Sequence, residues 1–120
     1  MALYPVRSNT REQLTAAIRF ETAGAADPST IVDPGGILSS ISGPTTTGTT
    51  GLYRLNFKAT YSQTMGVANS DNTAEYIANA RNARAISIDV ITKQIDIGGG
   101  SVAGVDTTGD QVTVMLMLQR

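Results

Sequence analysis

The side chains that could do chemistry in this chain are its carboxylates, because histidine and cysteine are both absent. Asp106 and Asp110 bracket Gly109, and Asp71 lies in the segment NSDN. A hard cation needs several converging oxygens, and neither group has the alternating acidic spacing or the closing glutamate of a calcium loop. Aspartate and asparagine commonly bond their own backbone in turns. We therefore interpret these residues as turn caps, with a weak surface cation site as the alternative.

Nucleophilic catalysis lacks its usual base as well. A serine or threonine nucleophile would have no histidine to take its proton, and Lys58 and Lys93 both occupy polar positions of expected strands. The run GGGSVAG (98–104) invites comparison with a phosphate loop, but that loop needs a following lysine and a helix N-terminus. Here the run VDT and then a strand follow. We expect no catalytic residue, cofactor or metal ion, although an acid/base pair among the ten acids stays open.

Length and composition are typical of a single β domain. The chain has 120 residues, of which 16% are charged and 5% aromatic, and Gly, Ser and Thr are abundant. This mixture favours strands and turns over helices. A net charge of -1 leaves no surplus of basic charge to meet phosphates, so no nucleic-acid partner is expected. No apolar run approaches the roughly 18 residues of a membrane span, and the N-terminus lacks the apolar run of a signal peptide.

We expect residues 1–13 to form an N-terminal arm and residues 14–120 to form one domain. In the arm, Pro5 and the polar run that follows it argue against a continuous core strand. Two interpretations stay open: the arm frays as free termini do, or it docks on a neighbouring protein. The residues that would make this contact are Leu3, Tyr4 and Val6.

Alternation of apolar and polar residues predicts strands over 14–22, 51–61 and 84–92, the last continuing through 93–97 after a bend. Each strand would turn one face inward, and these faces would meet in one core together with the last strand. The residues expected in this core are Phe20, Tyr53, Leu55, Phe57, Ile86, Ile88, Val114 and Leu116.

The first long turn-rich segment is 23–36, where two Asp-Pro steps and a Gly-Gly pair surround a short extended piece at 31–32. A short strand is expected next, with Ile37, Ser39 and Ile41 on one face. The segment GPTTTGTTG (43–51) would be a flexible surface loop that connects two strands of a hairpin.

The second half of the chain holds three weaker signals. Met65 and Val67 indicate a short strand. Residues 72–83 suit either a helix or a strand, and we favour a strand. The segment 98–110 is predicted to be a long Gly-rich loop before the last strand.

The last strand, 112–118, is apolar on both faces. Val112, Val114, Leu116 and Leu118 form one face, whereas Met115 and Met117 lie on the other with Thr113. A strand in a two-layer β domain normally leaves one face in water. Either a partner subunit or a loop of the same chain must therefore cover the two methionines. We favour a subunit interface at Met115 and Met117, because methionine adapts well to contact surfaces.

Seven or eight short strands separated by turns predict an all-β fold, an antiparallel, jelly-roll-like β-sandwich. The order of segments AADPSTIVDPGGILSSIS, GLYRLNF and ISIDVIT, followed by a Gly-rich loop and a terminal strand, resembles small virion proteins of tailed bacteriophages. Gly51, Tyr53 and Phe57 match a G-x-Y-x-x-x-F piece of that pattern. C1q-like and other trimeric jelly-roll modules share much of it.

This resemblance implies a protein that decorates and reinforces a capsid, often as a trimer, and that is made in the cytoplasm of the host bacterium. The partners would be further copies of the chain and the major capsid protein, with no membrane or nucleic acid. The alternative is the receptor- or glycan-binding head of a fibre, for which Tyr4, Tyr61 and Tyr76 are the candidate sugar-stacking residues. A hydrolase is disfavoured by the missing histidine and cysteine.

Overall fold

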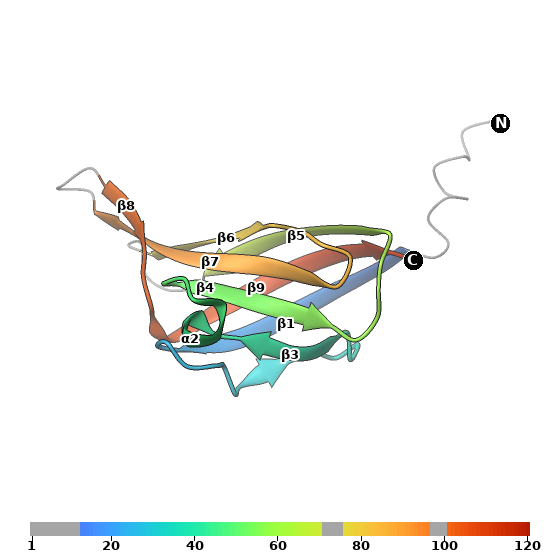
Figure 1. Ribbon diagram of the computed structural model, residues 1–120, viewed down its shortest axis with the longest axis horizontal. Coiled ribbons are helices and arrows are strands. Elements are labelled where there is room, and N and C mark those ends of the chain that lie inside the picture. Colours follow the sequence, from blue (N-terminus) through green and yellow to red (C-terminus); the bar gives the residue numbers. More distant parts are fainter. Residues whose placement is uncertain (1–12, 71–75, 97–100) are drawn as a thin grey trace.

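A computed structural model describes residues 13–70, 76–96 and 101–120. In these residues nine strands form two antiparallel sheets that pack face to face, with one short helical turn at the side (Figure 1). This confirms the predicted all-β sandwich. Within the described ranges, no helix is long and apolar enough to span a membrane.

Sheet A contains the two ends of the described chain. Its central strands pair over almost their whole length, from Gln13 opposite Gln119 to Glu21 opposite Gln111. The order of the sheet is β2 (Ile31–Val32), β1 (Gln13–Ala23), β9 (Thr108–Gln119) and β5 (Gln63–Ser70).

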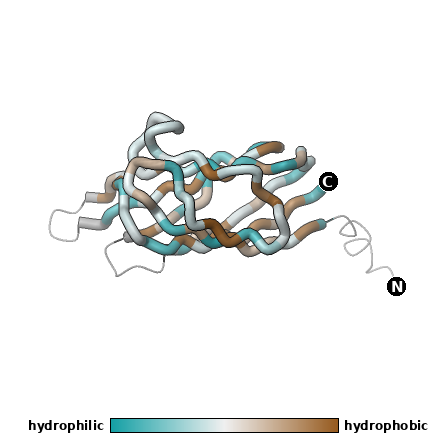
Figure 2. The backbone as a smooth tube through the Cα atoms, turned by 90° about the horizontal axis from the view of Figure 1, so that it is seen from below, coloured by the Kyte–Doolittle hydropathy of each residue, from teal (hydrophilic) through white to brown (hydrophobic). Residues whose placement is uncertain are grey.

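Sheet B covers the inner face of sheet A. Its order is β3 (Leu38–Ser42), β4 (Leu52–Phe57), β7 (Ser87–Asp96) and β6 (Tyr76–Arg81), and β8 (Ser101–Gly104) pairs with the end of β7. At one edge of the sandwich, β5 lies beside β6 (Figure 1). Figure 2 shows the same two layers from below, with hydrophobic positions spaced along the strands.

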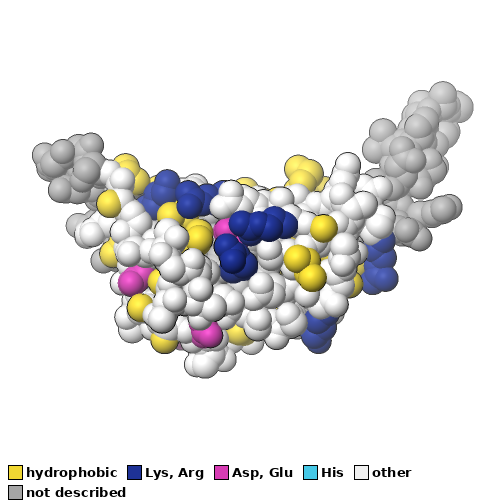
Figure 3. Space-filling model, viewed as in Figure 1, with side chains coloured by type: hydrophobic (Ala, Val, Ile, Leu, Met, Phe, Trp, Pro, Cys, Tyr) yellow, Lys and Arg dark blue, Asp and Glu magenta, His cyan; other side chains and the backbone are white. Residues whose placement is uncertain are grey.

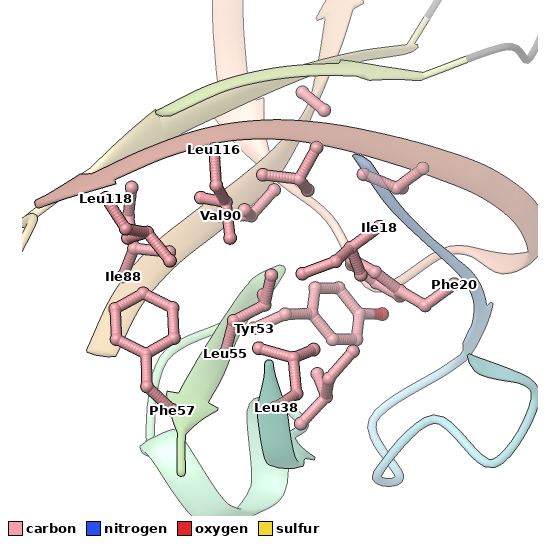
Figure 4. Packing of buried hydrophobic residues seen from close by; sticks show 14 of the residues in the cluster. Ile18, Phe20, Leu38, Tyr53, Leu55, Phe57, Ile88, Val90, Leu116 and Leu118 are labelled. Carbon is pink, nitrogen blue, oxygen red and sulfur yellow. The ribbon is translucent and has the colours of Figure 1, made fainter. Parts of the chain in front are cut away.

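The core forms where the inward faces of the two sheets meet (Figure 4). Tyr53 lies against Phe20 with ring centroids 5.3 Å apart, and Phe57 meets Tyr61 edge to face at 5.6 Å. Both arrangements are favourable for aromatic pairs. The structure confirms seven of the eight predicted core residues, namely Phe20, Tyr53, Leu55, Phe57, Ile88, Val114 and Leu116.

Ile86 is the exception, because its side chain is 57% exposed. It precedes β7, which begins at Ser87, and its backbone carbonyl accepts a hydrogen bond from the amide of Phe57. The alternation of the strand does not extend back to position 86. The prediction that this residue faces inward is therefore wrong.

A β-bulge changes the face expected for residues 37–41. The pairing of β3 with β4 shifts between Leu38 and Ser40, which places Leu38 and Ile41 in the core although they are three residues apart. Ser39, expected on the same face as Ile41, is exposed. The Asp33 carboxylate fixes the approach to the bulge, because it accepts hydrogen bonds from the amides of Ile37 (3.1 Å) and Leu38 (2.7 Å).

The segment 43–51 is more ordered than a surface loop. It contains α2 (Pro44–Thr47), one helical turn that joins β3 to β4, so the hairpin connection is confirmed and the flexible loop is not. The Asp27 carboxylate accepts hydrogen bonds from the Gly43 amide (2.6 Å) and the Thr46 hydroxyl (3.1 Å). A Cβ at position 43 would overlap the Ala26 carbonyl, so only glycine fits there.

Three other expected elements differ in extent or type, and one uncertain element is confirmed. The strand predicted to reach residue 61 ends at Phe57, and the strand expected near Met65 is an eight-residue element. The strand favoured over a helix for residues 72–83 is confirmed at Tyr76–Arg81, and residues 71–75 lie outside the described part. The segment expected to be a Gly-rich loop contains β8 and the start of β9.

Candidate functional site: the outer faces of the two sheets

The outer face of sheet A carries the two methionines singled out from the sequence. The register places Met117 between Thr15 of β1 and Met65 of β5, and Met115 between Ala17 of β1 and Val67 of β5. Four large apolar side chains therefore occupy two adjacent rungs of the sheet. Their exposed fractions are 45% for Met115, 46% for Met117, 62% for Met65 and 69% for Val67. We call this set the methionine face.

Polar but uncharged residues border the methionine face where β1 and β5 begin and β9 ends. There Gln13, Gln119 and Gln63 form the next rung. At the opposite end, Arg19 is paired with Thr113. The face thus extends over three rungs without an ionisable side chain. A shallow depression of about 310 Å³ lies on it, lined by residues of all three strands including Thr15, Met65 and Met115.

The inner face of the same strands explains why the residues of the methionine face point outward. On β9, the four residues that alternate with the methionines are fully buried in the core. On β5, small residues face inward because the sheets approach closely there. A Cβ on Gly66 would lie 2.8 Å from the Ile88 side chain and 3.0 Å from Leu116. The strand can therefore place its large apolar residues only on the outside.

Met115 and Met117 lie where the sequence predicts, on the outer face opposite the core. Whether that face is a subunit boundary stays a prediction. Met65 and Val67 belong to the same surface but were not recognised as site residues. Their alternation with small residues in the run QTMGVANS is the signal that could have revealed them. The arm residues Leu3, Tyr4 and Val6 lie outside the described part of the chain.

The glycan-stacking alternative loses one of its three aromatic residues. Tyr61 is buried against Phe57, with only 3% of its surface exposed, so it cannot stack on a sugar ring. Tyr4 and the side chain of Tyr76 lie outside the described part.

The outer face of sheet B is built around a buried carboxylate. The side chain of Asp89 on β7 has no exposed surface. Its Oδ1 accepts hydrogen bonds from Arg54 Nε and Arg84 Nη1, both at 2.9 Å. Its Oδ2 accepts from Arg84 Nη2 and Asn82 Nδ2, both at 3.1 Å, and from Arg54 Nη2 at 3.4 Å. The sequence did not predict this cluster, because β4 and the turn after β6 meet at Asp89 only in the folded sheet.

The electrostatics of this cluster favour a charged carboxylate. Burial by itself would raise the pKa of Asp89, but hydrogen bonds from Arg84, Arg54 and Asn82 outweigh it and lower the pKa to about 2. Asn82 adopts a left-handed backbone conformation with φ of 53°, which asparagine tolerates better than most residues. This turn brings both Asn82 and Arg84 over the carboxylate.

The carboxylates expected to cap turns bond more distant groups. Asp106 accepts a hydrogen bond from the amide of Gly51 at 2.6 Å, 55 residues away, and Asp110 accepts one from the Ser70 hydroxyl at 2.6 Å. Burial, together with the nearby charges of these two aspartates, raises the pKa of the Tyr53 phenol to about 12. Asp71 is outside the described residues. Among the residues that the structure describes, no three acidic, histidine or cysteine side chains are grouped for a metal ion.

Three comparisons with known proteins found no match to this chain. No family model, no curated protein and no solved structure matches it.

Proposed function

We propose that this chain is a structural virion protein that assembles through its methionine face and reinforces a phage capsid by binding across capsid subunits. The observation that carries the assembly step is the methionine face itself, with four large apolar residues in adjacent rungs and no ionisable neighbour over three rungs. A contiguous apolar surface of this kind is typical of a protein contact site.

The occupant proposed for this face is a second copy of the chain. An uncharged surface of adaptable methionines has no charge pattern that would repel a copy of itself. Complete burial of a methionine or valine side chain contributes about 1.5–3 kcal/mol. The four side chains are only partly exposed, so each gains a fraction of that amount. The strands are already ordered, so association does not add the cost of folding a segment.

The capsid role rests on the resemblance in strand and turn pattern, which also suggests a trimer. In this proposal the major capsid protein is the second partner, and the arm residues Leu3, Tyr4 and Val6 contact it. A protein that binds only the assembled shell stabilises it by mass action, because the contacts must be lost before the shell opens. The low net charge of -1 suits contact with protein rather than with packaged nucleic acid.

The assembly step is tested by measuring molar mass with light scattering after size-exclusion chromatography. The native protein should be an oligomer, and the double variant Met115→Lys, Met117→Lys should be a monomer with an unchanged circular dichroism spectrum. Val102→Lys is the matched control, because Val102 is 56% exposed but lies on β8 of the other sheet. A native protein that is monomeric at every soluble concentration would overturn the assembly proposal.

The virion role needs a separate measurement on particles. A protein inventory of the purified particle should contain the chain, and a density map should place it across neighbouring capsid subunits. Its presence only in a fibre would replace the decoration role with the fibre-head alternative.

A further inference from the structure

The outer face of sheet B gathers arginines from three segments around one acid. Arg54 of β4 and Arg81 of β6 are both register partners of Asp89, on either side of it. Arg84 follows in the turn between β6 and β7 and bonds the same carboxylate. Figure 3 shows basic side chains grouped around an acidic one on the side where β4 and β7 lie in front in Figure 1. We call these three residues the arginine cluster.

The arginine cluster has more positive charge than Asp89 can neutralise. Three guanidinium groups and one carboxylate leave an excess of two positive charges on this part of the surface. The whole chain has a net charge of -1, so the cluster is a local reversal of the overall sign. The neighbouring side chains on β3 and β4 carry no charge: Asn56 donates hydrogen bonds to the hydroxyls of Ser40 and Ser42.

Asp89 also holds two of the three arginines in fixed positions. Arg54 and Arg84 donate two hydrogen bonds each to its carboxylate, and their side chains remain 36% and 42% exposed. Among the described residues, Nη1 of Arg54 and Nε of Arg84 have no hydrogen-bond acceptor. These donors are therefore already oriented, and a ligand would not have to order two flexible side chains.

We propose that the arginine cluster binds a carboxylate-rich segment of a partner protein. Guanidinium groups match the planar geometry of carboxylates, and adjacent strands are only about 4.8 Å apart. The cluster is therefore compact enough for two or three neighbouring acidic side chains. A nucleic acid would follow an extended basic stripe, and the net negative charge of the chain opposes a long polyanion. The site is independent of the methionine face and lies on the opposite side of the sandwich.

The proposal is tested with a fluorescent hexaglutamate peptide and the full chain, by anisotropy at an ionic strength of about 0.1 M, where exposed charges more than about 10 Å apart are largely screened. The peptide should bind, and a hexaglutamine peptide of the same length should not. Arg81→Glu should weaken binding about tenfold or more, because it places a like charge beside the ligand. Arg81 is the chosen position because it is exposed and makes no hydrogen bond to Asp89 within the described chain. The fold should therefore survive the substitution, as its thermal midpoint will show.

Lys58→Glu is the matched control. It makes the same change in net charge at an exposed lysine close to Gly36, next to the far edge of sheet B, and should change hexaglutamate affinity less than about twofold. Equal weakening by both variants would show a general charge effect and overturn the site. Tighter binding of an oligothymidylate than of hexaglutamate would overturn the choice of a protein partner. Binding that appears only when the chain associates with itself would assign the acidic segment to a second copy.

Discussion

The outer faces of the two sheets differ in how their central strands are covered. On sheet B, Asp89 of β7 has no exposed surface because arginines from neighbouring segments lie over it. On sheet A, Met115 and Met117 of β9 remain nearly half exposed. A polar face can therefore be closed by long side chains of the same chain, which supply both atoms and hydrogen bonds. Among the described residues, no long side chain covers the apolar outer face of sheet A in this way.

The outer face of sheet B is also covered at the other end of β7, by β8 and by the segment around Thr50. Ile91 faces outward on this strand, yet it is buried. Gly104 of β8 and Thr50 lie close together there, since a Cβ on Gly104 would be 2.7 Å from the Thr50 carbonyl and 3.8 Å from the Ile91 side chain. No described segment lies in the same way over β9. The two sheets thus share one core but differ in what covers their outer sides.

The largest expected effect comes from the core that supports both faces. Phe57→Ala should lower the free energy of unfolding by about 3–5 kcal/mol, because it deletes a buried aromatic ring that packs against Tyr61. Lys58→Ala, at the exposed next position, should change it by less than about 0.5 kcal/mol. Urea unfolding measures both. A cost under about 1 kcal/mol for Phe57→Ala would mean that β4 presents the opposite face to the core.

A smaller effect is expected on the outer face of sheet B, where protonation of Asp89 at low pH should lower the free energy of unfolding. The pKa of Asp89 is lowered from 3.8 to about 2 by its arginine partners. Its folded-state stabilisation is therefore complete above pH 3.8 and is lost as the pH falls through about 2. The loss should be about 2 kcal/mol, measured by urea unfolding across this range. Asp89→Asn should remove this part of the pH dependence, and an unchanged profile would contradict the assigned ion pairs.

Added salt should affect the two outer faces differently, because binding at the arginine cluster depends on charge and assembly through the methionine face does not. Raising the salt concentration to about 0.5 M should weaken hexaglutamate binding about tenfold, because screening is strong beyond a few ångströms at that ionic strength. The oligomer formed through the methionine face should persist, since burial of apolar surface does not depend on charge attraction. Light scattering and anisotropy on the same samples give both results. Dissociation of the oligomer by salt would show that charged contacts hold it together.

The smallest effect on the free protein is expected from the arm. Deleting residues 1–10 should leave its thermal midpoint nearly unchanged, because these residues precede β1, which begins at Gln13. Ordering each arm residue costs roughly 1–2 kcal/mol of backbone entropy, which contact with a capsid would offset. The truncated protein should therefore occupy fewer sites on the particle. Full occupancy would assign no docking role to Leu3, Tyr4 and Val6.

Alternation in the sequence determined much of the inner architecture. The period of two along β1, β4 and β9 identified their core faces, since each strand has one uniformly apolar set. The same pattern marked Met115 and Met117 as an apolar set with no place in that core. The alternation did not predict that Ile86 lies outside β7 with an exposed side chain. It also did not predict the bulge that places both Leu38 and Ile41 in the core. Both depend on where pairing with β4 begins and shifts, which is a property of the sheet.

What covers each outer face was decided only by the tertiary structure. From the sequence alone, Asp89 is an ordinary polar position on the exposed face of an alternating strand. Its burial requires Arg54, which comes from another strand and is 35 residues away in the sequence. Met65 and Val67 join Met115 and Met117 only because β5 pairs with β9. Local sequence sets which side of a strand a residue faces, because that depends on backbone geometry alone. Its neighbours across the sheet depend on register and strand order, which arise from the packing of the whole chain.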